Sequence, residues 1–128
     1  MRRWALHDVA LELGCKKVAL GHNLDDAIET FLLSLFYEGR FNTFSPVTYL
    51  DRKGITVIRP LIYAPEPEII GVARRHSLPV VPSPCPAAGR TQREEMKNLL
   101  RSLAKTYPDI RTRFLHALKS KDNRHLWD

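Results

Sequence analysis

A buried-strand pattern, a polar loop and an amphipathic helix follow one another without a break between residues 17 and 39 of this chain. Residues 17–20 form a short apolar run that is typical of a buried strand. Residues 25–38 repeat apolar side chains at helical spacing, and Gly39 can end the helix. A strand that leads directly into a helix is the unit of folds built on a parallel sheet. The pattern therefore predicts an α/β fold.

Further strands and helices are predicted on both sides of this unit. Three β-rich runs are expected to be strands: residues 47–50, 55–61 and 79–81. The turn signal between the first two of these runs predicts a hairpin. Apolar periodicity and helix-starting residues predict four more helices: residues 2–13, residues 65–76, a helix capped by Thr91 and a helix opened by Pro108.

The order of these elements indicates the later part of a larger sheet. One parallel β-α-β unit is complete, from residues 17–20 through 25–38 to 55–61. The helix at residues 2–13 has no strand before it from which to cross over. We therefore expect the C-terminal part of a doubly wound, mainly parallel Rossmann-like sheet, followed by C-terminal helices. The 128 residues are enough for one small core but not for two independent ones.

Positive charge is concentrated in the last third of the chain. Residues 90–128 hold ten lysines and arginines against five acids, whereas residues 1–89 hold ten against nine. Four of the cations recur at spacings of three and four, on one helix face: Arg90, Arg93, Lys97 and Arg101. Such a face can contact nucleic-acid phosphates independently of sequence, or it can be the solvated side of an amphipathic helix. Both interpretations stay open.

The polar loop of residues 21–26, Gly-His-Asn-Leu-Asp-Asp, follows the first predicted strand. In open parallel sheets, ligands bind beyond the carboxyl ends of the strands. One interpretation is structural, with Asp25 or Asp26 capping the next helix and the other carboxylate favourable to its dipole. The other is functional, since two adjacent carboxylates and His22 can hold Mg²⁺ against phosphates or position a nucleotide. Arg59, at the end of a later predicted strand, can contact the nucleotide or a carboxylate.

Several classes of protein and site are excluded by the sequence. Its apolar stretches are too short to span a membrane, and its first residues do not resemble a secretory signal, so we expect a cytoplasmic protein with no membrane partner. Its six glycines are too widely spaced for a glycine-rich phosphate loop. Its two cysteines form no CxxC pair, which excludes a disulfide framework and a complete zinc site within this chain.

Cys85 lies between two prolines, in a segment that holds four of the nine prolines of the chain. A lone cysteine is commonly a small buried apolar residue, but this proline density excludes a helix or sheet interior and predicts a stiff, irregular loop. Because a rigidly presented thiolate suits metal ligation, Cys85 is predicted to be a metal ligand. Cys15, close to the end of a predicted helix, is interpreted as a packing residue.

Several motifs occur along the chain in a characteristic order. From the N-terminus they are LGHNLDD at residues 20–26, FYEG at 36–39, IRPL at 58–61, Cys85 followed by Arg93, and Tyr107-Pro108. In this order the sequence resembles the C-terminal part of the PP-loop ATPase family, specifically its tRNA 2-thiocytidine synthetase (TtcA-like) branch. The resemblance covers nearly the whole chain. It implies an adenine nucleotide alpha hydrolase-like fold, with residues 1–89 as a partial nucleotide-binding domain and residues 90–128 as a basic helical segment packed on it.

The resemblance also implies chemistry and partners. In such enzymes the C2 carbonyl oxygen of a cytidine in tRNA is activated by AMP transfer from ATP and displaced by sulfur, which a donor protein or sulfide supplies. The residues that would line the site for ATP and Mg²⁺ are His22, Asp25, Asp26 and Arg59, the two aspartates being the catalytic ones. Cys85 would be one ligand of a [4Fe-4S] cluster whose other protein ligands form a CxxC pair.

The sequence departs from the family pattern in two places. It contains neither the Ser-Gly-Gly-x-Asp-Ser loop that binds the pyrophosphate of ATP nor the CxxC pair. We therefore expect the chain to be inactive alone and to need an N-terminal half, from a longer chain or a separate polypeptide. An unpaired edge of the strand at residues 17–20 would favour self-association. The alternative is a non-catalytic tRNA-binding or regulatory module that retains part of the fold.

Overall fold

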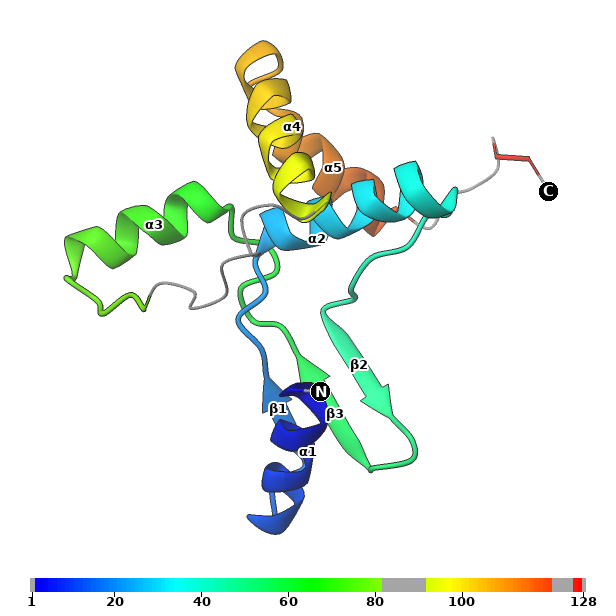
Figure 1. Ribbon diagram of the computed structural model, residues 1–128, viewed down its shortest axis with the longest axis vertical. Coiled ribbons are helices and arrows are strands. Elements are labelled where there is room, and N and C mark those ends of the chain that lie inside the picture. The colour runs from blue at the N-terminus through cyan, green and yellow to red at the C-terminus, as the bar shows by residue number, and fades with distance from the viewer. Residues whose placement is uncertain (1, 82–91, 121–125, 128) are drawn as a thin grey trace.

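The computed structural model describes residues 2–81, 92–120 and 126–127. Along the chain its elements are α1 (Arg2–Glu12), β1 (Lys17–Ala19), α2 (Leu24–Leu33), the π-helical η1 (Ser34–Glu38), β2 (Val47–Leu50), β3 (Ile55–Ile58), α3 (Glu66–Arg75), α4 (Gln92–Thr106) and α5 (Ile110–Lys119). Figure 1 shows the sheet and α1 at one end of the molecule and α2, α4 and α5 gathered toward the other. Cys85, Arg90 and the predicted Thr91 cap lie outside the described residues.

The sheet has three strands in the order β1-β3-β2. β1 and β3 are parallel, with Val18 beside Val57, and α2 lies between them in the chain, so the predicted parallel β-α-β unit is confirmed. β2 pairs antiparallel with β3 and confirms the predicted hairpin. The turn of this hairpin contains Gly54, whose φ of 62° is a left-handed conformation that glycine adopts without strain. The result is a mixed sheet in an α/β fold.

Two of the predicted strands differ from the structure. Residues 79–81 form no strand, because Pro79 has no amide hydrogen to donate to a neighbour and the two valines after it are highly exposed. β3 ends at Ile58, three residues earlier than expected. Pro60 cannot donate a ladder hydrogen bond, and the carbonyl of Arg59 closes a turn instead.

The N-cap of α2 is Asn23, so the prediction that Asp25 or Asp26 caps this helix is wrong. The Asp26 amide donates to Asn23 Oδ1, and the Asn23 amide donates to Asp26 Oδ2, both at 2.9 Å. This reciprocal capping box satisfies two amides at the helix end that have no intrahelical partner. At the other end, η1 stops at Gly39, whose φ of 66° confirms the predicted glycine stop.

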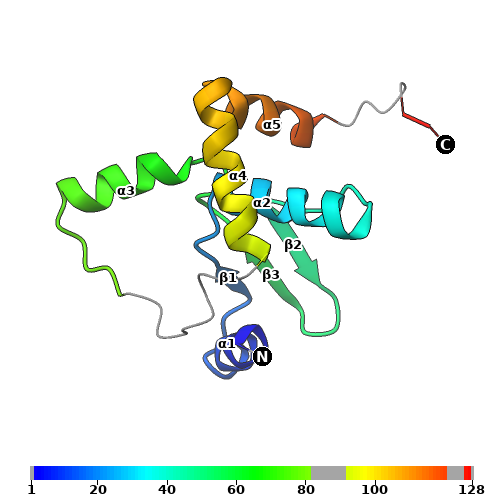
Figure 2. The same ribbon diagram turned by 45° about the horizontal axis from the view of Figure 1, so that its top comes forward.

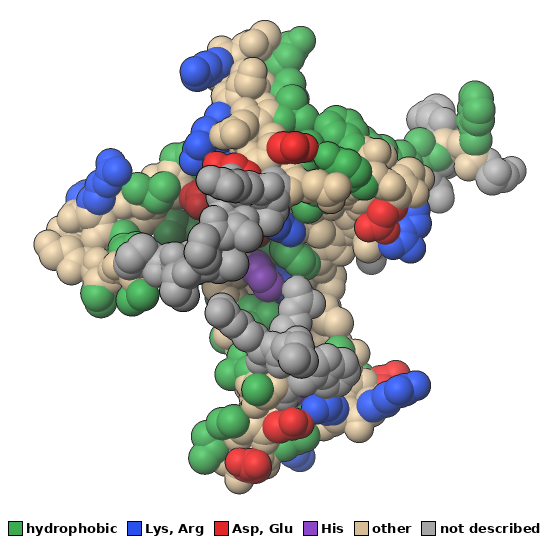
Figure 3. All heavy atoms as spheres, in the orientation of Figure 1, with side chains coloured by type: hydrophobic (Ala, Val, Ile, Leu, Met, Phe, Trp, Pro, Cys, Tyr) green, Lys and Arg blue, Asp and Glu red, His purple; other side chains and the backbone are tan. Residues whose placement is uncertain are grey.

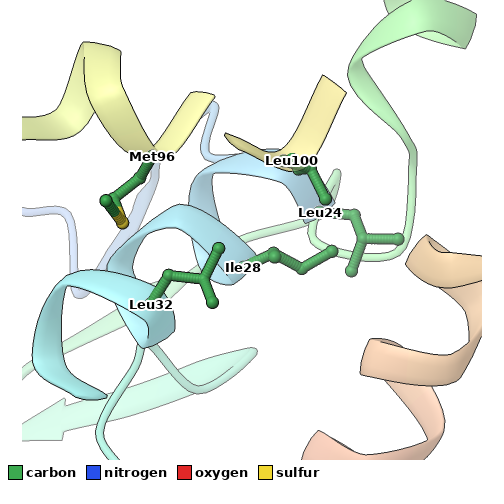
Figure 4. Close-up of a cluster of buried hydrophobic side chains, with 5 residues drawn as sticks. All are labelled: Leu24, Ile28, Leu32, Met96 and Leu100. Carbon is green, nitrogen blue, oxygen red and sulfur yellow. The ribbon is translucent and has the colours of Figure 1, made fainter. Parts of the chain in front are cut away.

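The larger core lies where α4 crosses α2 (Figure 2). Figure 4 shows its five buried side chains, which we call the helical cluster: Leu24, Ile28, Leu32, Met96 and Leu100. They recur four residues apart on each helix, so that each helix turns an apolar stripe toward the other. α5 packs against the cluster with Ile110, Phe114 and Leu115. The apolar periodicity that predicted these helices marks the faces that they bury here, except near the end of residues 25–38, where Phe36 is 56% exposed.

The second core is smaller and lies between α1 and the sheet. We call it the sheet cluster: Ala10, Val18, Ile55 and Val57. The apolar face predicted for the first helix was Leu6, Val9, Ala10 and Leu13, and only Ala10 of this set is buried. Leu13 is 74% exposed, and Cys15 just after it is exposed too, so its interpretation as a packing residue is wrong.

α3 projects from the rest of the molecule, as Figures 1 and 2 show from two directions. None of the described side chains of α3 is buried, and Ile70 and Val72 are both more than 40% exposed. Pro65 stands at its N-cap and Pro67 in its first turn, where a missing amide hydrogen costs nothing. In Figure 3, apolar side chains lie open on this helix and on the region of α1. Among the described helices, none is long and apolar enough to cross a membrane.

Candidate functional site

His22 and Arg59, predicted to line one site, are in contact at the carboxyl ends of β1 and β3. Arg59 Nε donates to His22 Nδ1 at 3.2 Å. The His22 ring stacks on Phe44 with ring centroids 4.5 Å apart, and the guanidinium carbon of Arg59 lies 5.0 Å from the centroid of the same ring. Because Nδ1 accepts this hydrogen bond, a neutral His22 carries its proton on Nε2. The histidine is therefore held in one orientation and one tautomer.

Arg59 is itself buried and held by the chain segment before β2. One of its terminal nitrogens donates to the carbonyl of Ser45 at 2.9 Å and to Thr48 Oγ1 at 3.2 Å. The sequence left open whether Arg59 contacts a nucleotide or a carboxylate. Its contacts with the His22 ring, the Phe44 ring, a carbonyl and a hydroxyl fix the loop around His22.

Asp25 is buried and tied to two other helices. Arg111 of α5 donates to it from Nε, which is 3.1 Å from both carboxylate oxygens, and from Nη2, which is 3.0 Å from Oδ2. The Glu66 amide at the start of α3 donates to Oδ1 at 2.9 Å. A bidentate guanidinium and a backbone amide together offset the cost of burying this carboxylate. Asp25 thus joins the start of α2 to α3 and α5, and Arg111 is a partner that the sequence did not single out.

Asp26, next to Asp25, faces a different environment. Its Oδ2 accepts from the Asn23 amide within the capping box, and the side chain is only partly buried. Both aspartates therefore have partners within the chain, which agrees with a structural role for the loop. The partners are Arg111 for Asp25 and the Asn23 amide for Asp26, whereas the sequence predicted that one of the aspartates is the N-cap. Of the two carboxylates, Asp26 is the one with access to a ligand from solution.

Glu29 is the buried acid that the sequence reasoning missed. Its side chain is fully buried, with Arg93 Nη1 3.5 Å from Oε1 and Lys97 Nζ 3.4 Å from Oε2. Burial raises the pKa of Glu29, although Lys97 opposes that shift. Burial alone would lower the pKa of Lys97, but its hydrogen bond to Glu66 and the charges of Glu29 and Glu66 outweigh burial and raise it. One signal was available, since Glu29 follows Asp25 by four residues on the face that α2 buries.

Three carboxylates, those of Asp25, Glu29 and Glu66, each offer an oxygen within 4.8 Å of the other two. Such a cluster has the ligand type that Mg²⁺ prefers. Its charge is already balanced by three cations, however, since Arg93 and Lys97 contact Glu29, Lys97 also contacts Glu66, and Arg111 holds Asp25. The arrangement fits an ion-pair network between helices better than a cation site.

The predicted phosphate-binding stripe is only partly available to a ligand. Arg93 donates to Thr30 Oγ1 at 2.8 Å, and Lys97 donates to Glu66 at 2.9 Å. These two side chains form the polar margin of the contact between α2 and α4, because the carboxylate of Glu29 is buried beneath them. Arg101 is exposed, and Arg90 lies outside the described residues. Phosphate binding by the stripe stays a prediction that rests mainly on Arg101.

The fold and the polar loop at the carboxyl edge of its parallel strands define an α/β domain of the nucleotide-binding type. Residues 1–103 match the PP-loop domain family, and the chain belongs to this family. Over its whole length it is 42% identical to the tRNA-cytidine(32) 2-sulfurtransferase of Syntrophotalea carbinolica and 43% identical to that of Geobacter metallireducens. It spans 50% and 51% of those two proteins, or about half of their length.

A solved structure gives the same picture of the fold. The U34-tRNA thiolase NcsA from Methanococcus maripaludis, with its [4Fe-4S] cluster, resembles 91% of this chain with a TM-score of 0.71 and 27% sequence identity. The matched region is 39% of the NcsA chain. Both kinds of relative are tRNA-modifying enzymes, and this chain matches only part of the length of each.

Proposed function

We propose that this chain is part of an ATP-dependent tRNA thiolation enzyme, which adenylates the C2 carbonyl of a cytidine in tRNA and then transfers sulfur to it. The observation that carries the proposal is the alignment of the whole chain, at 42–43% identity, with sulfurtransferases that act on tRNA cytidine. The geometry supports it, because the His22 loop lies at the carboxyl edge of the parallel strands. A tRNA substrate would place the reaction in the cytoplasm.

ATP would be bound only in part by this chain. The amides of Asn23 and Asp26 at the start of α2 are taken by the capping box, and two carboxylates occupy the first turn. Phosphates do not fit there, since a helix end binds anions through unpaired amides and a favourable dipole. We therefore assign the pyrophosphate to the half that this chain lacks, His22 and Arg59 to the wall of the nucleotide site, and Asp26 to Mg²⁺.

A [4Fe-4S] cluster would need more than this chain. Cys85 is the proposed ligand, and a single thiolate does not hold such a cluster, for which three or four protein ligands are usual. The cluster of the NcsA relative supports iron-sulfur chemistry in the complete enzyme. Cys15, which is exposed, supplies a matched control. The proposed partners are tRNA, a sulfur donor protein or sulfide, and the missing half; without that half, the chain is expected to self-associate.

The experiment is thiolation of tRNA in a bacterial strain that lacks its own tRNA-cytidine 2-sulfurtransferase. We expect no 2-thiocytidine when this chain is expressed alone, and restored 2-thiocytidine when the N-terminal half of the Syntrophotalea carbinolica relative is co-expressed, measured by mass spectrometry of digested tRNA. Thiolation by the chain alone would refute the proposal that it is only part of the enzyme. A stable complex of the two halves that leaves tRNA unmodified would refute the proposed activity.

Two pairs of variants sharpen this experiment. Asp26→Asn keeps a side-chain acceptor for the capping box but removes the charge, so we expect loss of thiolation without loss of folding, whereas Asp51→Asn in the exposed hairpin turn should change neither. In the anaerobically purified complex, Cys85→Ser should remove the brown colour and the iron, and Cys15→Ser should leave both.

The second candidate is a non-catalytic tRNA-binding or regulatory module. One observation favours it, namely that the carboxylates of Asp25 and Asp26 both have partners within the chain. Binding of tRNA by the complex of the two halves, with normal thiolation by the Asp26→Asn variant, would support this candidate over the first.

A further inference from the structure

A cavity of about 410 Å³ opens next to the His22 loop, at the same edge of the sheet. Its walls come from the start of α2, the segment before β2, the turn after β3 and the C-terminal half of α5. Its volume lies within the range of roughly 300–1,000 Å³ that is usual for small-molecule sites. The proposed nucleotide and iron-sulfur sites do not use it.

The lining of the cavity offers flat apolar surfaces and few unused polar groups. Ala27, Leu115 and Leu118 form part of the wall. Two of the hydroxyls in the lining are already bonded to backbone, since Thr43 Oγ1 donates to the carbonyl of Ala27 at 2.6 Å and Ser45 Oγ donates to that of Val47 at 2.8 Å. A ligand would therefore be held mainly by apolar contact with its flat faces and by the fit of its shape to the cavity.

Two aromatic rings and one cation also line the cavity. Phe44 and Tyr63 are part of its lining, and Tyr63 is 52% exposed, so that much of this side chain is open to a ligand. Lys119 Nζ lies 5.4 Å from the centroid of the Tyr63 ring, at the end of α5. Aromatic faces beside a lysine are the combination that binds unstacked nucleobases, because the ring stacks on the base while the ammonium attracts the neighbouring phosphate.

Phe44 connects this cavity to the candidate site. The ring that lines the cavity is the same ring that stacks on His22 and lies under Arg59. An occupant of the cavity would therefore lie close to the loop at which the proposed chemistry takes place, in contact with a side chain that positions the histidine.

We propose that this cavity receives one unstacked nucleobase of the RNA substrate, stacked against Tyr63 and Phe44, with Lys119 beside its phosphate. The inference deepens the proposed function and rests on it, since it names the part of the tRNA that this site binds. An alkyl chain would use the apolar wall but neither the exposed ring nor the cation. A side chain of the missing half is the other occupant that the test distinguishes.

The test is titration of the 128-residue chain with cytidine monophosphate, followed by the NMR signals of the methyl groups of Ala27, Leu115 and Leu118. We expect these signals to shift in a saturable manner. Ribose phosphate, which lacks the base, should leave them in place. Tyr63→Leu keeps an apolar side chain but removes the ring, and should weaken binding about ten-fold, because stacking on an aromatic side chain contributes roughly 1–3 kcal/mol per base.

Matched variants control for general effects of the substitutions. Tyr49→Leu replaces a tyrosine that is 60% exposed on β2, outside the cavity lining, and should bind cytidine monophosphate as the parent does. Lys119→Gln should weaken binding and reduce its dependence on salt, whereas Lys105→Gln, exposed near the end of α4, should change neither.

Three results would overturn the inference. The first is a cytidine monophosphate titration that leaves the three methyl groups unshifted. The second is an equal response to ribose phosphate, which would assign the effect to the phosphate alone. The third is a response that disappears when the missing half is bound, which would show that a side chain of that half fills the cavity. All three concern the cavity only, and the thiolation assay reports separately on the proposed function.

Discussion

The helical cluster and the sheet cluster are completed to different degrees by this chain. α2, α4 and α5 bury their apolar stripes against one another, and Ile28 and Leu100 are almost fully excluded from water. Around the sheet, Ala10 is buried, but Leu6, Val9 and Leu13 remain exposed on α1. β1 forms one edge of the described sheet and is paired only with β3. Apolar surface and an open strand edge are features of a protein interface.

The difference indicates where the remaining half of the relatives would pack. The helical cluster is a closed interior, because none of its five side chains is more than 6% exposed. The exposed sides of α1 and β1 are the surfaces that a further strand and helix would cover in a doubly wound fold. This agrees with the chain spanning about half the length of its relatives. Stability should therefore come mainly from the helical cluster.

The largest effect is expected from Leu100→Ala in the helical cluster. Leu100 is 1% exposed, so truncation leaves a cavity and should lower the free energy of unfolding by roughly 3–5 kcal/mol. Leu13→Ala on α1 is the control, and it should change the free energy by less than about 0.5 kcal/mol, since the side chain already contacts water. Urea denaturation of both variants is the measurement. Equal losses would show that α1 is covered, by self-association or otherwise.

Lys97→Met should have the next largest effect. It removes the ammonium between Glu29 and Glu66 and leaves a fully buried carboxylate with Arg93 as its only remaining ion-pair partner among the described residues. Breaking a buried ion pair from one side is strongly destabilising, and we expect a loss of about 2–3 kcal/mol because Arg93 remains. Lys105→Met, at an exposed position of the same helix, is the control. A loss no larger than that of this control would mean that Glu29 becomes protonated at little cost.

Local patterns in the sequence predicted most of the elements but not the pairing between them. The strand, loop and helix between residue 17 and Gly39 are each encoded by a few neighbouring residues. The structure has β1 and α2 where the sequence predicted a strand and a helix, and η1 after α2 ends at Gly39 as predicted. The burial of α1 could not be predicted, because the spacing of Leu6, Val9 and Leu13 indicates the apolar side of a helix but not what covers that side, and here these three side chains are exposed. Residues 79–81 were misread because valines favour strands only where a neighbouring strand exists.

The sequence predicted which residues belong to the candidate site but not which side chains pair with one another. His22 and Arg59 were assigned to one site and do touch. Arg93 and Lys97 were predicted to lie on the surface, because they are on the side of α4 opposite its apolar stripe. In the structure both side chains form ion pairs with Glu29, at the margin of the contact between α4 and α2. No periodicity within one helix reveals an acid on another helix, so this pairing appears only after packing.

A smaller effect is expected from Asn23→Ala, which removes one acceptor of the capping box at the start of α2. The Asp26 amide would lose its partner, and the free energy of unfolding should fall by about 1 kcal/mol. Asn42→Ala, at an exposed position after η1, is the matched control and should be close to neutral. If Asn23→Ala is as stable as this control in the same urea experiment, the cap must be replaced by Asp25 or by water.

The smallest effect, and the most diagnostic for the buried charges, is the pH dependence of Glu29→Gln. Burial raises the pKa of Glu29 in the folded chain above its ordinary value of 4.5, so the contribution of this side chain to stability is fully present below about pH 4.5 and is lost as the pH rises through the raised pKa. Glutamine does not titrate and keeps a polar side chain of the same shape. We therefore expect the variant to gain stability relative to the parent between pH 4 and pH 7.

Glu68→Gln, on the exposed side of α3, controls for the loss of one negative charge from a basic protein. The difference in unfolding free energy between parent and Glu29→Gln should grow with pH in favour of the variant, whereas the difference for Glu68→Gln should not. Lys97 stays protonated throughout this range, because its pKa is raised, so the change belongs to the carboxylate. A variant that becomes less stable than the parent as the pH rises would show that the ion pairs with Lys97 and Arg93 outweigh the cost of burying Glu29.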